Sequence, residues 1–122
     1  MEAAMKPRVS TIQAKEFQAA SLRRQLAQFD RMIGDLETIK AELAKQIDQE
    51  ERRTNNGDPG SVLYSTVARA ARDRRENLSE TLDDLTGRRQ RVVEAIGDLD
   101  GFFAALNSAD HLPPVPSSWV AA

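Results

Sequence analysis

TNNGDPGS, residues 54–61, is a turn sequence near the middle of a chain of 122 residues. Asn, Gly, Asp and Pro favour turns because they accept or fix backbone angles that helices and strands exclude. Two long segments without proline flank this stretch, at about 8–55 and 61–110, and the remaining prolines lie near the two ends. The proline positions therefore predict two long elements, a turn at about 55–61 and a proline-rich tail over 111–122.

Mostly apolar residues repeat every seven positions in both segments, with a few charged residues among them. The first segment carries two such sets, one at Ile12, Ala19, Leu26, Ile33, Lys40 and Ile47, and one at Lys15, Leu22, Phe29, Leu36, Leu43 and Glu50. The second segment carries the sets Ala68, Arg75, Leu82, Arg89, Ile96 and Phe103, and Tyr64, Ala71, Leu78, Leu85, Val92, Leu99 and Leu106. Alternating spacings of three and four are typical of coiled coils. No stretch alternates with the period of two that strands require.

We therefore expect an all-α fold, with residues 1–110 forming a long antiparallel two-helix coiled-coil hairpin. Helix one is expected at about 8–55 and helix two at about 61–108, since two long helices joined by a short turn run antiparallel. The tail over 111–122, which holds the single Trp, Trp119, is expected to be disordered or extended, with folding back onto the hairpin as the open alternative. A turn near Pro59 places Ile47 level with Ala71 across the seam.

The helix starts offer capping residues. Ser10 and Gln13 are spaced for a capping box at the start of helix one. Asp58, Ser61 and Ser65 are three alternative caps for helix two.

Polar residues and glycines interrupt the two helices. In the expected register Arg89 faces Phe29, where a cation–π contact can offset part of the desolvation of the guanidinium. The simpler interpretation is that such long polar side chains reach solvent from a seam that two helices leave partly open. The outer helix faces carry four glycines, each of which costs about 1 kcal/mol relative to Ala: Gly34, Gly87, Gly97 and Gly101. Two interpretations of these glycines stay open, a surface that tolerates them or a smooth face on which another protein packs.

The composition argues against several kinds of site. Without Cys there is no disulfide, no cysteine zinc site and no thiol nucleophile. His111 is the single His, which argues against a His-rich metal site or a catalytic triad, and no phosphate-binding glycine loop occurs. We therefore predict a protein that is not an enzyme, with no catalytic, cofactor-binding or metal-binding residues and no small-molecule substrate.

Charge and hydropathy limit the partners. The chain holds 17 Lys and Arg against 19 Asp and Glu, a formal net charge of −2, whereas general nucleic-acid binders are usually strongly basic. No run of 18 apolar residues predicts a membrane span, and residues 1–9 lack the apolar run of a signal peptide. We expect a cytoplasmic protein.

Arginines cluster in the second segment, which contains no Lys. Arginine favours bidentate binding to carboxylates, as on a partner protein. Asp73, Glu76 and Glu80 are interleaved at helical spacing, so pairing within the helix is the simpler interpretation for most of these arginines. The same acidic residues interrupt any continuous track for phosphates, which makes DNA or RNA the weaker alternative.

A pattern of residues around the turn is shared with a known family. It comprises Glu50-Glu51-Arg52-Arg53-Thr54, Asp58-Pro59, Tyr64, Thr66, Ala68, Ala70-Ala71 and Arg74-Arg75-Glu76-Asn77-Leu78. With Met5-Lys6, Arg8, Phe17-Gln18, Arg24-Gln25, Ala27-Gln28 and Met32-Ile33, it resembles FliJ-type flagellar export proteins, most closely their alphaproteobacterial branch, over about residues 5–100. The tail with Pro113, Pro114 and Trp119 departs from the family pattern.

The resemblance implies a non-enzymatic stalk or adaptor of the flagellar type III export system, at the cytoplasmic face of the basal body. Family members resemble the central stalk of rotary ATP synthases, enter the ring of the export ATPase and contact the cytoplasmic part of the membrane export gate. The implied partners are that ATPase and that gate, with export chaperones as further candidates and attachment to the membrane through protein contacts only.

On this pattern we predict a partner-binding set comprising Tyr64, Arg69, Arg72, Arg74, Asn77 and Arg88. The turn end is expected to meet the gate, and the helix ends near Lys15 and Phe103 to enter the ATPase ring. The alternatives are a coiled-coil scaffold that dimerises through its outer face and a nucleic-acid-associated hairpin with arginine-rich faces.

Overall fold

Two long helices make up the fold. The computed structural model describes residues 8–110, with side chains through Ser108. Helix α1 spans Val9–Thr54 and helix α2 spans Thr66–Asp110, 46 and 45 residues, and the two pack against each other. At 1.5 Å per residue each is about 65–70 Å long. No strand occurs in the described range, so the predicted all-α class is confirmed there; the predicted tail over 111–122 lies outside it.

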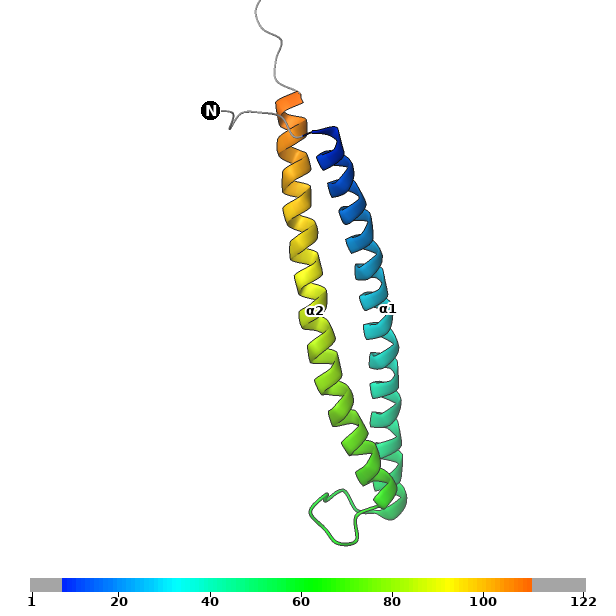
Figure 1. Cartoon of the computed structure of the whole chain (residues 1–122). Coiled ribbons are helices and arrows are strands. Elements are labelled where there is room, and N and C mark those ends of the chain that lie inside the picture. Colours follow the sequence, from blue (N-terminus) through cyan, green and yellow to red (C-terminus); the bar gives the residue numbers. More distant parts are fainter. Residues whose placement is uncertain (1–7, 111–122) are drawn as a thin grey trace, which may run out of the picture.

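The helices lie side by side with the start of α1 next to the end of α2 (Figure 1). At one end the Lys15 ammonium lies 5.3 Å from the centre of the Phe102 ring. At the other end the Arg72 guanidinium lies 3.0 Å from a Glu51 carboxylate oxygen. Neither described helix has an apolar stretch long enough to cross a bilayer.

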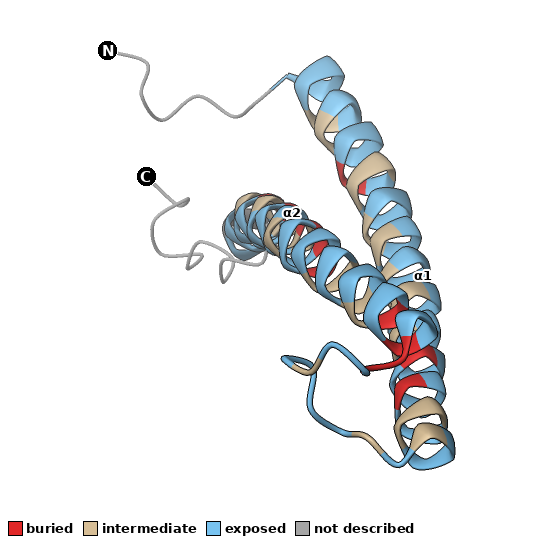
Figure 2. Cartoon of the chain, turned by 90° about the horizontal axis from the view of Figure 1, so that it is seen from below, coloured by how far each residue is buried: buried red, intermediate tan, exposed pale blue. Residues whose placement is uncertain are grey.

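The tightest packing lies near the connecting loop (Figure 2). Leu43 and Ile47 of α1 form a buried cluster with Ala71 of α2, and Leu78 packs against it. Ile47 and Ala71 therefore share a layer, as the expected register requires.

Farther from the loop, the two helices contribute unequally to the seam. On α2 Leu82, Leu85, Val92 and Leu99 are buried. On α1 Ala19 is buried, but the larger seam side chains are only half-buried: Leu22, Leu26, Phe29, Ile33 and Leu36. Two helices cannot enclose a seam on all sides, so part of its apolar surface stays accessible.

The first helix begins without a side-chain cap. Arg8 occupies the N-cap position with extended backbone and makes no side-chain capping bond. The predicted capping box at Ser10 is wrong, because the helix already begins at Val9 and Ser10 lies within its first turn.

The second helix begins at Thr66, five residues later than the expected start at about 61. Two successive turns occupy the intervening residues, since the Ser61 N–H donates to the Asp58 carbonyl and the Tyr64 N–H donates to the Ser61 carbonyl. Ser65 Oγ then accepts the Ala68 N–H at 3.2 Å. Of the three alternative caps, the structure uses Ser65.

The expected contact of Arg89 with Phe29 is absent from the described residues. Arg89 Nε instead donates to the carboxylate of Asp30, the residue that follows Phe29. A full negative charge attracts a guanidinium more strongly than the face of an aromatic ring does. Of the two interpretations of Arg89, the cation–π contact with Phe29 does not form, and the guanidinium reaches the open edge of the seam, where its side chain is 38 % exposed.

Candidate functional site at the loop end

The loop between the helices, residues 55–65, is an ordered structure with its own hydrogen bonds. Asn55 ends α1 in the left-handed conformation, at φ 51° and ψ 38°, which Asn tolerates better than most residues. The Asn56 side chain accepts the Asp58 N–H at 3.0 Å, and the Asp58 side chain accepts the Gly60 N–H at 3.0 Å. These side-chain turns hold the backbone on both sides of Pro59.

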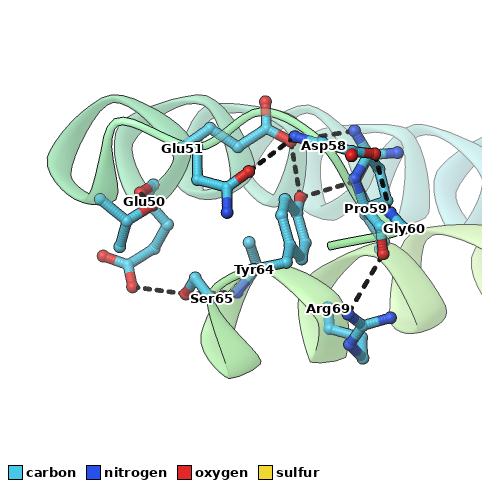
Figure 3. A network of polar contacts seen from close by, with 12 residues as sticks. Glu50, Glu51, Asp58, Pro59, Gly60, Tyr64, Ser65 and Arg69 are labelled. Carbon is cyan, nitrogen blue, oxygen red and sulfur yellow. Dashed lines mark hydrogen bonds and ion pairs between the residues drawn. The ribbon is translucent and has the colours of Figure 1, made fainter. Parts of the chain in front are cut away.

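Tyr64 anchors the loop to both helices (Figure 3). Its side chain is 4 % exposed, and its hydroxyl donates to Glu51 Oε2 at 2.6 Å and accepts from Arg72 Nε at 2.8 Å. Arg72 Nη2 also donates to Glu51 Oε2, at 3.0 Å. The guanidinium carbons of Arg69 and Arg72 lie 5.4 Å and 5.8 Å from the centre of the Tyr64 ring. The ring therefore lies between the end of α1 and the first turns of α2.

Arg69 holds the outer part of the loop. Its Nη2 donates to the Pro59 carbonyl at 3.1 Å, which ties the loop back to the second turn of α2 (Figure 3). A charged donor strengthens such a bond to a backbone carbonyl. The loop backbone at Pro59 is thus held close to α2.

A second carboxylate fastens the start of α2. Glu50 accepts hydrogen bonds from Arg53 Nε at 2.7 Å and from Ser65 Oγ at 3.0 Å. The hydrogen bond from Arg53, followed by that from Ser65, lowers the pKa of Glu50 from 4.5 to about 2.

The hydrogen bond from Tyr64, followed by that from Arg72, likewise lowers the pKa of Glu51. The hydrogen bonds that Arg72 donates to Tyr64 and then to Glu51 raise the pKa of Arg72. Both carboxylates are ionised near neutral pH, so their chemistry suits them to hold the loop rather than to donate protons. Within residues 8–110 no three His, Asp or Glu side chains converge as metal ligands.

This anchored loop presents two neighbouring apolar side chains to solvent. Val62 is 100 % exposed and Leu63 is 83 % exposed. The Leu63 N–H donates to Ser61 Oγ at 3.1 Å, so the backbone beneath these side chains is held. Exposed apolar residues on a fixed loop are typical of protein contact sites.

Sequence reasoning missed Val62 and Leu63 as site residues. The expected second helix included both of them, in positions where exposure carries no special meaning. The signal that was available is the pair of apolar residues between the turn stretch and Tyr64. Only the late start of α2 leaves the two residues in the loop, where both are exposed.

The structure brings three of the six predicted partner-binding residues together. Tyr64, Arg69 and Arg72 meet at the loop, and each uses its polar group within the chain. Their direct contact with a partner stays a prediction; their observed contacts fix the position of the loop.

The other three predicted residues lie apart from the loop network. Arg74 and Asn77 are exposed on α2. Arg88 pairs with Asp84 at 3.0 Å on the same helix, which is the intrahelical pairing that the sequence left open.

The chain matches no protein-family model, no curated protein and no solved structure. The proposals below therefore rest on the geometry of the loop end and on the residue pattern around it.

Proposed function

We propose that this chain is a non-enzymatic adaptor that binds other proteins through its loop end. On the resemblance to FliJ-type proteins, it is an antiparallel coiled-coil stalk of the flagellar type III export system. Its partners are then the export ATPase and the cytoplasmic part of the membrane export gate, which it couples during flagellum assembly at the cytoplasmic face of the basal body.

One observation carries the adaptor proposal. Val62 and Leu63 are almost wholly exposed on a loop whose base is fixed by Tyr64, Glu51 and Arg72. Ordering a loop before binding reduces the entropy lost when a partner docks. Two buried apolar side chains then contribute about 1.5–3 kcal/mol each, enough to make them central to a contact.

The length of the helices supports the stalk proposal. Two paired helices of 46 and 45 residues separate the loop from the other end by about 65–70 Å. Such a rod can contact one protein at its loop and another at its opposite end. Ion pairs along its surface are weak and reversible, which suits transient contacts.

The proposal is tested first on the loop. The double variant Val62→Ser with Leu63→Ser is expected to weaken binding to the isolated cytoplasmic part of the export gate at least about tenfold. Phe17→Ser removes another exposed apolar side chain, 72 % exposed and near the opposite end, and serves as the control, with gate binding unchanged. Equal binding by the loop variant and the parent chain would refute the docking role of the loop.

The export function is tested by ATP hydrolysis. Purified export ATPase from the same organism is expected to hydrolyse ATP faster, and to assemble into rings, when this chain is added. If the rate of ATP hydrolysis does not change and the chain does not co-elute with the ATPase, the export proposal is refuted. The adaptor proposal is then decided by the loop experiment alone. Retention on DNA or RNA at physiological salt would favour the nucleic-acid alternative instead.

A further inference from the structure

The loop between the helices contains an asparagine followed directly by a glycine, Asn56 and Gly57. Asparagine is a chemically labile residue, because the backbone nitrogen of the next residue can attack its side-chain carbonyl and release the amide as ammonia. Glycine has no side chain to obstruct this approach. Whether the reaction takes place in a folded chain depends on the freedom of that nitrogen and on the position of the asparagine side chain.

The Gly57 nitrogen is available as the nucleophile. Gly57 is exposed, and its N–H donates no hydrogen bond to any described residue. The neighbouring amides differ, since the Asn56 N–H donates to the Glu51 carbonyl at 3.1 Å and the Asp58 N–H donates to Asn56 Oδ1 at 3.0 Å. Hydroxide can therefore remove the Gly57 proton without breaking a hydrogen bond of the fold.

The Asn56 side chain is held for attack. The bond from the Asp58 N–H to Asn56 Oδ1 closes a turn that folds the side-chain amide over the Gly57 peptide. Asn56 Nδ2 donates to Ser61 Oγ at 3.2 Å, which fixes the other side of the amide. When the carbonyl is attacked, negative charge develops on Oδ1, and the Asp58 N–H is already in place to stabilise it.

The other asparagines in the described range lack these features. The nitrogen that follows Asn55 is that of Asn56, whose N–H is bonded to the Glu51 carbonyl. Asn77 and Asn107 lie within α2, where the N–H of the next residue takes part in the helix hydrogen bonds. The structure therefore singles out Asn56.

We propose that Asn56 is a modification site at which the loop deamidates itself, and that the change loosens the loop. Hydroxide takes the proton from the Gly57 nitrogen, which then bonds to Asn56 Cγ. The bond from Cγ to Nδ2 breaks, the departing nitrogen takes a proton from water and leaves as ammonia, and a cyclic imide remains. A water molecule opens this ring to aspartate or isoaspartate, so the net reaction consumes one water and releases one ammonia.

The isoaspartate product changes the backbone of the loop. Its main chain runs through the former side chain, which inserts a methylene group before Gly57. The oxygen that accepted the Asp58 N–H becomes a main-chain carbonyl oxygen, and the amide donor to Ser61 is lost. A new carboxylate also lies one residue from Asp58, whose side chain holds the Gly60 N–H. The turns around Pro59 therefore weaken, while the Tyr64 anchor stays in place.

The modification itself does not depend on the proposed function, and only its effect on docking rests on that function. Val62 and Leu63 lie on the same loop. A loosened loop loses more conformational entropy when a partner docks, so binding weakens. Deamidation thus lowers the affinity of the loop as a molecule of this protein ages.

Mass spectrometry of the folded full chain, incubated in mildly alkaline buffer, tests the modification. We expect a mass increase of about 1 Da, because a hydroxyl replaces an NH2 group, with isoaspartate located at residue 56 by peptide mapping. The rate is expected to rise with pH, since hydroxide starts the reaction. Circular dichroism verifies that the incubated chain remains helical.

Gly57→Ala is the matched control. A Cβ at this position lies 3.9 Å from Glu51 Oε1, an ordinary contact, and Gly57 has no positive φ, so the loop accepts the methyl group. That group obstructs the approach of the nitrogen, and modification is expected at least about tenfold slower. An unchanged mass of the parent chain, an equal rate in Gly57→Ala, or equal modification of Asn77 and Asn107 overturns the proposal.

Hydrogen exchange of fresh and aged chain tests the loosening. The amides of Asp58, Gly60 and Leu63, which side chains hold in the fresh loop, are expected to lose protection at least about threefold, whereas those of α2 keep theirs. Equal protection in the modified chain overturns the loosening.

Binding of fresh and aged chain to the isolated cytoplasmic part of the export gate separates the two proposals. The modified chain is expected to bind at least about threefold more weakly. If the loop is modified and loosened but gate binding stays equal, the docking role of the loop is refuted and the modification site is confirmed.

Discussion

Tyr64→Phe is the sharpest test of the loop anchor, because it removes one oxygen atom and keeps the buried ring. The hydroxyl donates to Glu51 at 2.6 Å and accepts from Arg72 at 2.8 Å. Both partners are charged, and hydrogen bonds to charged groups contribute about 1.5–3 kcal/mol each to stability. The direct contact of Arg72 with Glu51, at 3.0 Å, survives the substitution.

The expected loss in the free energy of unfolding is therefore about 1–2 kcal/mol, less than two full charged hydrogen bonds. Water also reaches the partners, whose side chains are 21 % exposed at Glu51 and 35 % at Arg72. For a helical domain of this size a loss of 1 kcal/mol lowers Tm by about 4–8 °C. We expect the larger effect in the loop, where the amides of residues 61–65 lose protection.

Urea unfolding gives the free energy, and hydrogen exchange at residues 61–65 reports on the loop. A double-mutant cycle of Tyr64→Phe with Arg72→Met is expected to show a coupling of about 1 kcal/mol, since both act on one network. Thr81→Val removes a hydroxyl that bonds only within α2 and serves as the matched control, with a change below about 0.5 kcal/mol. No loss for Tyr64→Phe and no coupling would refute the anchor.

Three further predictions concern the helices and their pH dependence. A Cβ at Gly34, Gly97 or Gly101 meets no atom within 4 Å outside the adjoining helix backbone. Each change to Ala is therefore expected to raise the free energy of unfolding, measured by thermal denaturation, by about 0.5–1 kcal/mol. A loss of stability at any of these positions would instead favour strain or a packing role. Leu43→Ala is expected to destabilise by about 2–4 kcal/mol and Leu26→Ala by about half as much, because Leu43 is buried and Leu26 only half-buried; equal losses in urea titrations would contradict the uneven seam. Because the pKa of Glu50 is about 2 in the folded chain and the ordinary value is 4.5, its contribution is complete above about pH 4.5 and disappears as pH falls towards 2. The fall in stability over that range is expected to be smaller in Glu50→Gln, and an unchanged pH profile in that variant would rule out this carboxylate as its cause.

Local features of this chain could be predicted because their causes are local. The apolar repeat produces two helices through contacts that recur every three or four residues, and the described chain has those helices at 9–54 and 66–110. The end of α1 also has a local cause. Asn55 takes the left-handed conformation that terminates the helix, and Asn tolerates this conformation better than most residues. Asp58, Ser61 and Ser65 can all cap a helix, and the sequence alone did not show which of them caps α2. The structure shows that it is Ser65.

Features of the candidate site depend on which residues the two helices bring together. Tyr64 is buried because Glu51, thirteen residues earlier, and Arg72 both reach its hydroxyl, and no local rule predicts that meeting. Val62 and Leu63 are exposed because the Tyr64 anchor and two turns delay the start of α2.

The sequence by itself determined that the described chain forms two long helices with an apolar repeat, because backbone preference and periodicity act over a few residues. Only the tertiary structure decided that Arg89 pairs with Asp30 and that Tyr64 lies between Glu51 and Arg72. These outcomes depend on the register and rotation of one helix against its neighbour. Both are set by the packing of side chains from distant parts of the chain.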